Sequence, residues 1–243
     1  MQAALLECRN LTKKFGGLAA LDDFNCIVKE NEIVGLVGPN GSGKTTFLNL
    51  VVGVYPPSNG VILFRGEKIT GLPPNKIIKL GIAKTNQIPK PFFNLTVLEN
   101  VIMGGIFGSN MRKEDAEKNA NELLEFVGLS HVKNEFPEKL TGVQLKLLEL
   151  ARALNARPKL LLLDEIAAGV SELEIKQIQS LIRRINEEWN VSIIWVEHII
   201  EAVSETCDKL ICLNEGRKIA EGEPHKVLRC DEVVKAYLGD WIC

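Results

Sequence analysis

The feature that most constrains the fold of this chain is the loop over residues 38–45, which has the sequence GPNGSGKT. It matches the phosphate-binding pattern G-x-x-x-x-G-K-[ST] at every fixed position. An apolar run over 33–37 predicts a buried strand before the loop, and 46–52 predicts an apolar helix after it. Strand, glycine loop and helix in this order predict a nest of inward-pointing N–H groups at the positive end of a helix. The predicted binding residues are Gly38, Pro39, Asn40, Gly41, Ser42, Gly43, Lys44, Thr45 and Thr46.

Two side chains of this loop have expected partners. We expect Lys44 to reach the β- and γ-phosphates of a nucleotide, and the Thr45 hydroxyl to bind Mg²⁺. The alternative is an ordinary glycine turn between a strand and a helix, which the complete motif in its strand–loop–helix context disfavours. The dinucleotide pattern G-x-G-x-x-G does not occur here, so a nicotinamide or flavin site is also disfavoured.

A second stretch, residues 159–165, places two carboxylates directly after four consecutive leucines. Such a run predicts a strand buried on both faces, as in a parallel sheet. Asp164 at its end occupies the position at which phosphate-loop ATPases hold Mg²⁺, and Glu165 can polarise an attacking water. A plain strand end followed by a solvated acidic turn is the alternative.

The rest of the chain predicts two α/β parts with a helical insertion between them. Short strands and turns are expected over 5–34, and a core is expected over about 1–87 and 158–243. Residues 88–157 lack clear strands and predict a helical subdomain, with a helix starting at the capping box of Thr96 and Glu99. Within this insertion we expect a loop over 105–111, then helices over 112–127 and 142–156.

Composition and the pattern of apolar segments disfavour several classes of protein. The 243 residues carry 29 Lys and Arg against 31 Asp and Glu, so the charge gives no support for a nucleic-acid binder. Six scattered cysteines without a C-x-x-C pair or a His cluster disfavour a zinc site, and buried or surface thiols in a reducing cytosol are expected. The N-terminus does not read as a signal peptide, and no apolar run of about eighteen residues predicts a membrane span.

Three further features, combined with the loop and the leucine strand, resemble the ATP-binding cassette (ABC) ATPases: Gln87, the segment Leu140–Gln144 and His198. The resemblance covers nearly the whole chain. It implies an α/β fold, with a RecA-like phosphate-loop NTPase core, an N-terminal antiparallel β subdomain and an inserted helical subdomain. It also implies ATP and Mg²⁺ as ligands, and two subunits that clamp two ATPs head to tail.

The resemblance assigns roles to residues outside the loop. Phe15 matches the aromatic residue that stacks on adenine, although its side chain could equally be part of the core. Gln87 matches the glutamine that touches Mg²⁺ or water and relays the γ-phosphate state to the helical subdomain. Glu165 matches the catalytic glutamate, and His198 the switch histidine at the γ-phosphate. Asp164 matches the aspartate on the Mg²⁺ side.

The signature segment is the place where the sequence departs from the family pattern. Residues 140–144 read Leu-Thr-Gly-Val-Gln, where the family usually has Leu-Ser-Gly-Gly-Gln. Thr141 keeps the hydroxyl and is expected to cap the following helix, so Thr141, Gly142 and Gln144 are expected to face the partner subunit's ATP. Val143 would be strained if the position required a positive φ. Ile166 also replaces a common proline.

Weaker similarities place the chain beside the ATP-binding subunits of branched-chain amino-acid importers: Glu165–Gly169, the Val-Glu-His at 196–198, residues 147–154, and Ala236–Gly239. We therefore expect an ATPase that energises a membrane importer, working with permease subunits and a second ATP-binding subunit. It is expected to lie in the cytoplasm, on the inner face of the membrane. The alternatives are a transporter ATPase for another cargo such as urea or lipid, a soluble ABC ATPase acting on DNA or ribosomes, and a non-hydrolysing regulatory subunit.

Overall fold

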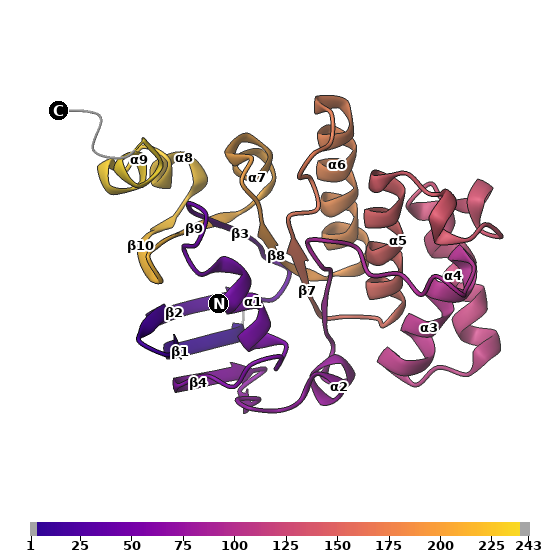
Figure 1. The fold of residues 1–243 in the computed structure, drawn as a ribbon, viewed down its shortest axis with the longest axis horizontal. Coiled ribbons are helices and arrows are strands. Elements are labelled where there is room, and N and C mark those ends of the chain that lie inside the picture. The colour runs from indigo at the N-terminus through magenta and orange to yellow at the C-terminus, as the bar shows by residue number, and fades with distance from the viewer. Residues whose placement is uncertain (1–3, 239–243) are drawn as a thin grey trace.

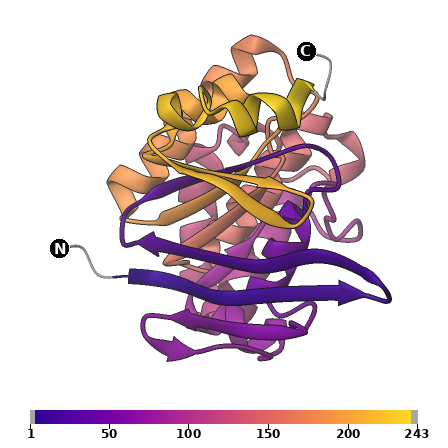
Figure 2. The ribbon, with the colours of Figure 1, turned by 90° about the vertical axis from the view of Figure 1, so that its left-hand side faces the viewer.

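The structure is a computed structural model that describes residues 4–238, and it contains two β-sheets flanked by helices (Figure 1). The first sheet is antiparallel, with strand order β2-β1-β4-β5. Figure 2 shows its two long strands crossing the molecule below the C-terminal strands of the second sheet, which are yellow. The strands are β1 (Ala4–Phe15), β2 (Leu18–Lys29), β4 (Asn59–Phe64) and β5 (Glu67–Lys68).

The N-terminal segment forms two strands of twelve residues each instead of several short ones. Their pairing contains several register shifts, and Asn10 and Asp23 adopt positive φ values of 49° and 50°. Such bulges interrupt the two-residue alternation of apolar side chains. The broken alternation is the reason that the sequence predicted shorter strands.

The second sheet has the order β10-β9-β3-β8-β7-β6. All of its neighbouring strands run parallel except β10 and β9, which pair antiparallel. The carboxyl ends of β3, β8, β7 and β6 therefore lie side by side at one edge, where ligands of open α/β sheets bind. The strands are β3 (Ile33–Val37), β6 (Ile82–Lys84), β7 (Leu160–Asp164), β8 (Ser192–Val196), β9 (Lys209–Asn214) and β10 (Arg217–Gly222).

The leucine strand β7 is buried on both faces, as its sequence predicted. Leu160 and Leu162 belong to one hydrophobic core, and Leu161 and Leu163 belong to the other. The first core lies between the two sheets and includes helix α1 (Lys44–Val51). The second core lies under α6 (Glu172–Trp189) and α7 (Ile200–Thr206), above the sheet in Figure 1.

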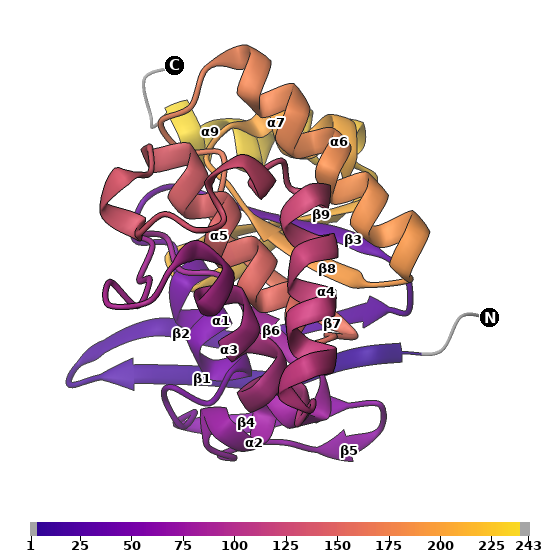
Figure 3. The ribbon, with the colours of Figure 1, turned by 90° about the vertical axis from the view of Figure 1, so that its right-hand side faces the viewer.

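Residues 88–157 contain helices and no strand, and they lie at one side of the sheet (Figure 3). Capping boxes start two of the helices, one between Thr96 and Glu99 and one between Thr141 and Gln144. The side chains of this segment join the second core, so it packs directly on the sheet. The elements are α3 (Val97–Ser109), α4 (Lys113–Phe126), α5 (Gly142–Asn155) and 3-10 turns at Ser130–Val132 and Pro137–Lys139.

The predicted loop over 105–111 is wrong, because α3 continues to Ser109. Two glycines of α3 lie at close contacts with α5 and the residue that follows it. A Cβ on Gly104 would lie 2.0 Å from the Arg152 carbonyl oxygen, and one on Gly108 would lie 2.4 Å from the Ala156 Cβ. Glycine is needed here because two helices approach closely, and the sequence alone gives no sign of that packing.

The remaining helices are short and lie near the two outer strands of the second sheet, β6 and β10. Gly81 ends the turn before β6 with a φ of 98°, as expected of a C-terminal cap. Across residues 4–238, no helix combines the length and the apolar character needed to cross a membrane. These elements are α2 (Pro74–Ile77), a 3-10 turn at Ile78–Leu80, α8 (Pro224–Val227) and α9 (Asp231–Leu238).

Candidate functional site

The glycine loop joins β3 to α1 and has the conformation that its motif predicts. Gly38 and Gly43 have φ values of 148° and 107°. A Cβ at these positions would lie 2.0 Å from the Leu213 carbonyl oxygen and 2.4 Å from the Ala20 carbonyl oxygen, respectively. Both positions therefore exclude side chains, and the loop curls over the first turn of α1. This is the geometry of an anion-binding nest.

The Lys44 side chain lies inside this loop. Its Nζ donates hydrogen bonds to the carbonyl oxygens of Gly38 at 2.8 Å and Pro39 at 2.9 Å. Burial lowers the pKa of Lys44, while the nearby carboxylates of Glu165 and Asp164 act in the opposite direction. A buried cation beside a nest of N–H groups is suited to bind polyanionic phosphates.

Asp164 lies at the end of β7 with 1% of its surface exposed. The Thr45 Oγ1 is 3.5 Å from Asp164 Oδ1, and Lys84 Nζ forms an ion pair with Oδ2 at 3.0 Å. Oδ2 nevertheless accepts no hydrogen bond of good geometry, although it is buried. A hydroxyl beside a buried carboxylate with a free lone pair is a set of oxygen donors that fits Mg²⁺.

Glu165 follows Asp164 and is contacted by two of the predicted site residues. Gln87 Nε2 donates to Glu165 Oε2 at 2.5 Å, and His198 Nε2 lies 2.6 Å from Glu165 Oε1. Gln87 follows β6 and His198 follows β8, so residues from three neighbouring strands meet here. The backbone of Glu165 is left-handed, with a φ of 51°. A non-glycine residue in this region is strained, a condition often found at functional sites.

One pocket of about 270 Å³ collects most of the predicted residues. Three larger cavities, of about 460, 610 and 330 Å³, lie elsewhere and include no part of the glycine loop. The smaller pocket is therefore the candidate site. It is lined by Ala20, Asn40, Gly41, Ser42, Gly43, Lys44, Thr45, Thr46, Gln87, Glu165 and His198.

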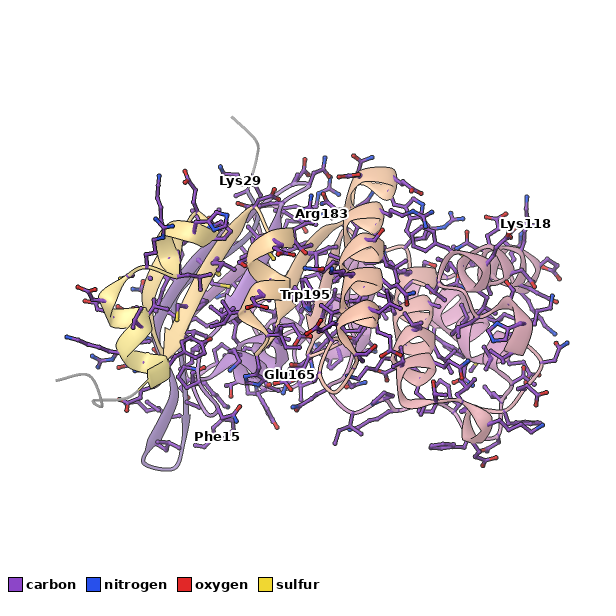
Figure 4. All side chains as sticks on the ribbon, turned by 90° about the horizontal axis from the view of Figure 1, so that it is seen from above. Phe15, Lys29, Lys118, Glu165, Arg183 and Trp195 are labelled. Carbon is purple, nitrogen blue, oxygen red and sulfur yellow. The ribbon has the colours of Figure 1, made fainter. Side chains whose placement is uncertain are left out.

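Phe15 is a predicted site residue that does not line this pocket. It ends β1 with 45% of its surface exposed, and its ring packs edge-on against Tyr55 at a centroid distance of 5.4 Å. The Lys13 ammonium lies 5.0 Å from the same ring. Figure 4 shows Phe15 at the lower edge of the molecule. An exposed aromatic ring is not part of the core, which removes one of the two sequence alternatives for Phe15.

The signature residues also lie apart from the pocket, at the start of α5. The Thr141 hydroxyl accepts from the Gln144 N–H at 3.3 Å, and the Gln144 side chain accepts from the Thr141 N–H at 2.9 Å. Gly142 is the first residue of the helix and Val143 the second. Val143 has no positive φ, so the replacement of glycine causes no backbone strain. Its side chain lines a groove with Leu147 and Leu173.

Sequence analysis missed four residues around the site: Ala20, Lys84, Lys146 and Glu197. Lys84 contacts Asp164 because β6 and β7 pair in the sheet. This pairing depends on the strand order, which the sequence alone does not give. Burial raises the pKa of Glu197 to about 7, against hydrogen bonds from Ala167, Trp195 and His198. A carboxylate next to His198 at a strand end was a visible signal, but nothing in the sequence indicated its burial.

The fold and the site define an ATP-binding cassette. The sequence model of the ABC transporter family matches residues 21–168, and the chain belongs to that family. Its class is that of the ABC ATPases, which bind and hydrolyse ATP.

Several relatives are similar over nearly their whole length. The branched-chain amino acid transport ATP-binding protein BraF of Pseudomonas aeruginosa is 35% identical, over 99% of this chain and 100% of the relative. A probable LivG protein of Archaeoglobus fulgidus is 40% identical, over 97% and 95%. The lipopolysaccharide export ATP-binding protein LptB of Haemophilus influenzae is 32% identical, over 98% of both chains.

Solved structures of cassettes have the same fold. A nucleotide-free cassette from an ABC transporter aligns with a TM-score of 0.86 and 30% identity, over 98% of this chain and 100% of that one. The ADP conformation of the cassette MJ1267 aligns with a TM-score of 0.88 and 32% identity, over the same shares. The dimeric cassette MJ0796 bound to ADP and Pi aligns with a TM-score of 0.82 and 29% identity, over 90% and 98%.

Proposed function

We propose that this chain energises a membrane importer of branched-chain or other hydrophobic amino acids by hydrolysing Mg·ATP in the pocket described above. The observation that carries the proposal is the meeting of Lys44, Gln87, Glu165 and His198 in one pocket with the glycine loop. These groups come from the ends of four adjacent strands, β3, β6, β7 and β8. They supply a phosphate nest, a cation, a carboxylate and an orienting imidazole, which phosphoryl transfer to water requires.

We propose that the phosphates bind to the loop N–H groups and to Lys44. The Lys44 ammonium would then exchange its hydrogen bonds to the Gly38 and Pro39 carbonyls for contacts with the phosphates. Thr45, Asp164 and Gln87 would hold Mg²⁺, which when bound neutralises part of the phosphate charge. The fit of Thr45 and Asp164 to a cation supports this assignment. Phe15, exposed at the end of β1, would stack on the base.

Glu165 would orient and activate the attacking water, and His198 would hold the Glu165 carboxylate and the γ-phosphate in line. Gln87 would report the state of the site to the helical segment over 88–157, which we propose acts as a subdomain. The contacts of Glu149 on α5 support this role, because its carboxylate accepts from the N–H groups of Asn86 and Lys90, both at 2.8 Å. The Gln87 loop is thus attached to the helical segment.

We propose that a second ATP-binding subunit completes the site, with its Thr141, Gly142 and Gln144 facing the bound ATP. The free N–H groups at the start of α5 are suited to a γ-phosphate. The dimeric form of the similar cassette MJ0796 supports pairing of two cassettes.

A permease subunit would dock at the side of the molecule, which places the chain on the cytoplasmic face of the membrane. A groove of about 330 Å³ lies between the end of β6 and helices α3 and α5, and Phe92 and Phe107 line it. Phe107 has 63% of its surface exposed. Exposed aromatic side chains beside a groove are typical of protein interaction sites.

The cargo assignment depends on the names of the relatives BraF and LivG. The similarity to LptB supports a second candidate, an ATPase for lipid export. Reconstitution of the chain with its own permease in liposomes distinguishes them. We expect ATP-dependent leucine uptake that Glu165→Gln abolishes; ATP-dependent movement of lipid without leucine uptake would favour the second candidate.

A further inference from the structure

The turn that carries Glu165 needs support from outside itself. Glu165 has a positive φ of 51°, and its N–H donates to the Val196 carbonyl at 2.9 Å. The turn closes with a long hydrogen bond of 3.3 Å from the Ala168 N–H to the Glu165 carbonyl. A strained residue keeps its conformation only when neighbouring groups hold it there. The direction of the Glu165 carboxylate therefore depends on groups that fix this turn.

One of these groups is Lys146, which comes from helix α5. Its Nζ donates to the Glu165 carbonyl at 3.2 Å and to the Ala168 carbonyl at 2.5 Å. It thus bridges the first and the last residue of the turn. Burial lowers the pKa of Lys146, and the carboxylates of Glu197 and Glu165 act against this effect. The Lys146 ammonium is half-buried and donates to two carbonyls of a strained turn. An exposed lysine side chain would be free to extend into solvent, so this contact is specific.

Glu197, which follows β8, also contacts this turn. Its Oε1 accepts from the Ala167 N–H at 2.5 Å and from the Trp195 Nε1 at 3.3 Å. Glu197 and Trp195 are both fully buried. In Figure 4, Glu165 and Trp195 lie in the middle of the molecule, between the C-terminal helices and the helical segment. An ammonium on two carbonyls and a buried carboxyl group on an N–H therefore both fix the turn.

We propose that Lys146 is a positioning residue for ATP hydrolysis, because it ties the Glu165 turn to the helix that begins with the signature residues. The inference rests on the proposed function, in which Glu165 activates water and Thr141 and Gly142 face the ATP of the partner subunit. Lys146 is on the second turn of that helix. A shift of α5 caused by one ATP would thus be transmitted to the Glu165 that acts on the other ATP.

Lys146→Met tests this inference by removing the bridge while keeping the aliphatic stem. We expect kcat to fall on the order of 10- to 100-fold, since a small misplacement of a catalytic group has effects of this size. ATP affinity should stay unchanged, because the hydrogen bonds of Lys146 go to the Glu165 and Ala168 carbonyls and not to the glycine loop. Lys146→Arg keeps a cationic donor and should restore most of kcat. Lys118→Met, on the exposed face of α4 and far from Glu165 in Figure 4, is the matched control.

Lys146→Gln is measured alongside, because it stays polar but is too short to bridge the two carbonyls, and it should show the same loss of kcat. Wild-type kcat in both Lys146→Met and Lys146→Gln would overturn the inference. A kcat loss matched by a lower Tm and not restored by arginine would overturn it as well. Glu165→Gln separates the two proposals: if it keeps turnover, the proposed role of Glu165 fails. If it is inactive while Lys146→Met is active, only the inference fails.

Discussion

Two glutamates lie near each other at this site but have different surroundings. Glu165 lines the pocket and contacts the side chains of Gln87 and His198. Glu197 is fully buried behind it and accepts hydrogen bonds from Ala167 and Trp195. The accessible carboxylate is suited to activate water, and the buried one is suited to hold backbone in place.

Glu197 gives a prediction for stability against pH. Burial raises its pKa to about 7 in the folded chain, from 4.5 in the unfolded chain. The folded chain keeps the proton to higher pH, so this group's contribution is present below the unfolded pKa and is lost as pH rises through about 7. Between about pH 5.5 and about pH 8.5 the wild-type chain should lose about 2 kcal/mol of unfolding free energy that Glu197→Gln does not lose.

Urea unfolding of both chains at the two pH values checks this expectation. From the lower to the higher pH, the unfolding free energy of the wild type should fall relative to that of Glu197→Gln. Parallel stability profiles for the two chains would show that Glu197 does not hold a proton in the folded state.

At the scale of elements, local sequence signals predicted the parts that depend on local geometry. The strand–loop–helix unit over 33–51 and the capped starts of α3 and α5 were predicted because the signal and the structure involve the same few residues. The length of β1 and the end of α3 were not, because they depend on strand bulges and on helix contacts. Lys84, Lys146 and Glu197 were missed for the same reason, since strand order and packing bring them to the site.

The contact between α3 and α5 gives a prediction at this scale. Gly104→Ala adds a methyl group where the Arg152 carbonyl oxygen is 2.0 Å away. In a free helix the change would stabilise by about 1 kcal/mol, but overpacking at this contact should instead destabilise by about 1 to 3 kcal/mol. Gly142→Ala, at the open start of α5, has no neighbouring atom within 4 Å and is the control for stability. Thermal unfolding compares the two, and a Gly104→Ala chain as stable as the control would refute close packing here.

At the scale of the whole molecule, the two proposed parts of the ATP site do not meet within one subunit. The pocket with the glycine loop, Glu165 and His198 lies at the edge of the parallel sheet. The signature residues Thr141 and Gly142 begin α5 and are absent from that pocket. In the proposed dimer, two copies arranged head to tail would bring each signature to the other's pocket, so ATP itself should hold the dimer together.

The most direct test of this account is the mass of the Glu165→Gln chain in solution, measured by size-exclusion chromatography with light scattering, with and without Mg·ATP. Glu165→Gln should keep ATP binding and nearly abolish turnover, so the ATP-bound state accumulates. We expect a dimer only when Mg·ATP is present, and a monomer when Lys44→Ala is added, because that change weakens phosphate binding. A Glu165→Gln chain that binds Mg·ATP and remains monomeric would contradict the claim that Thr141 and Gly142 complete the site of a second copy.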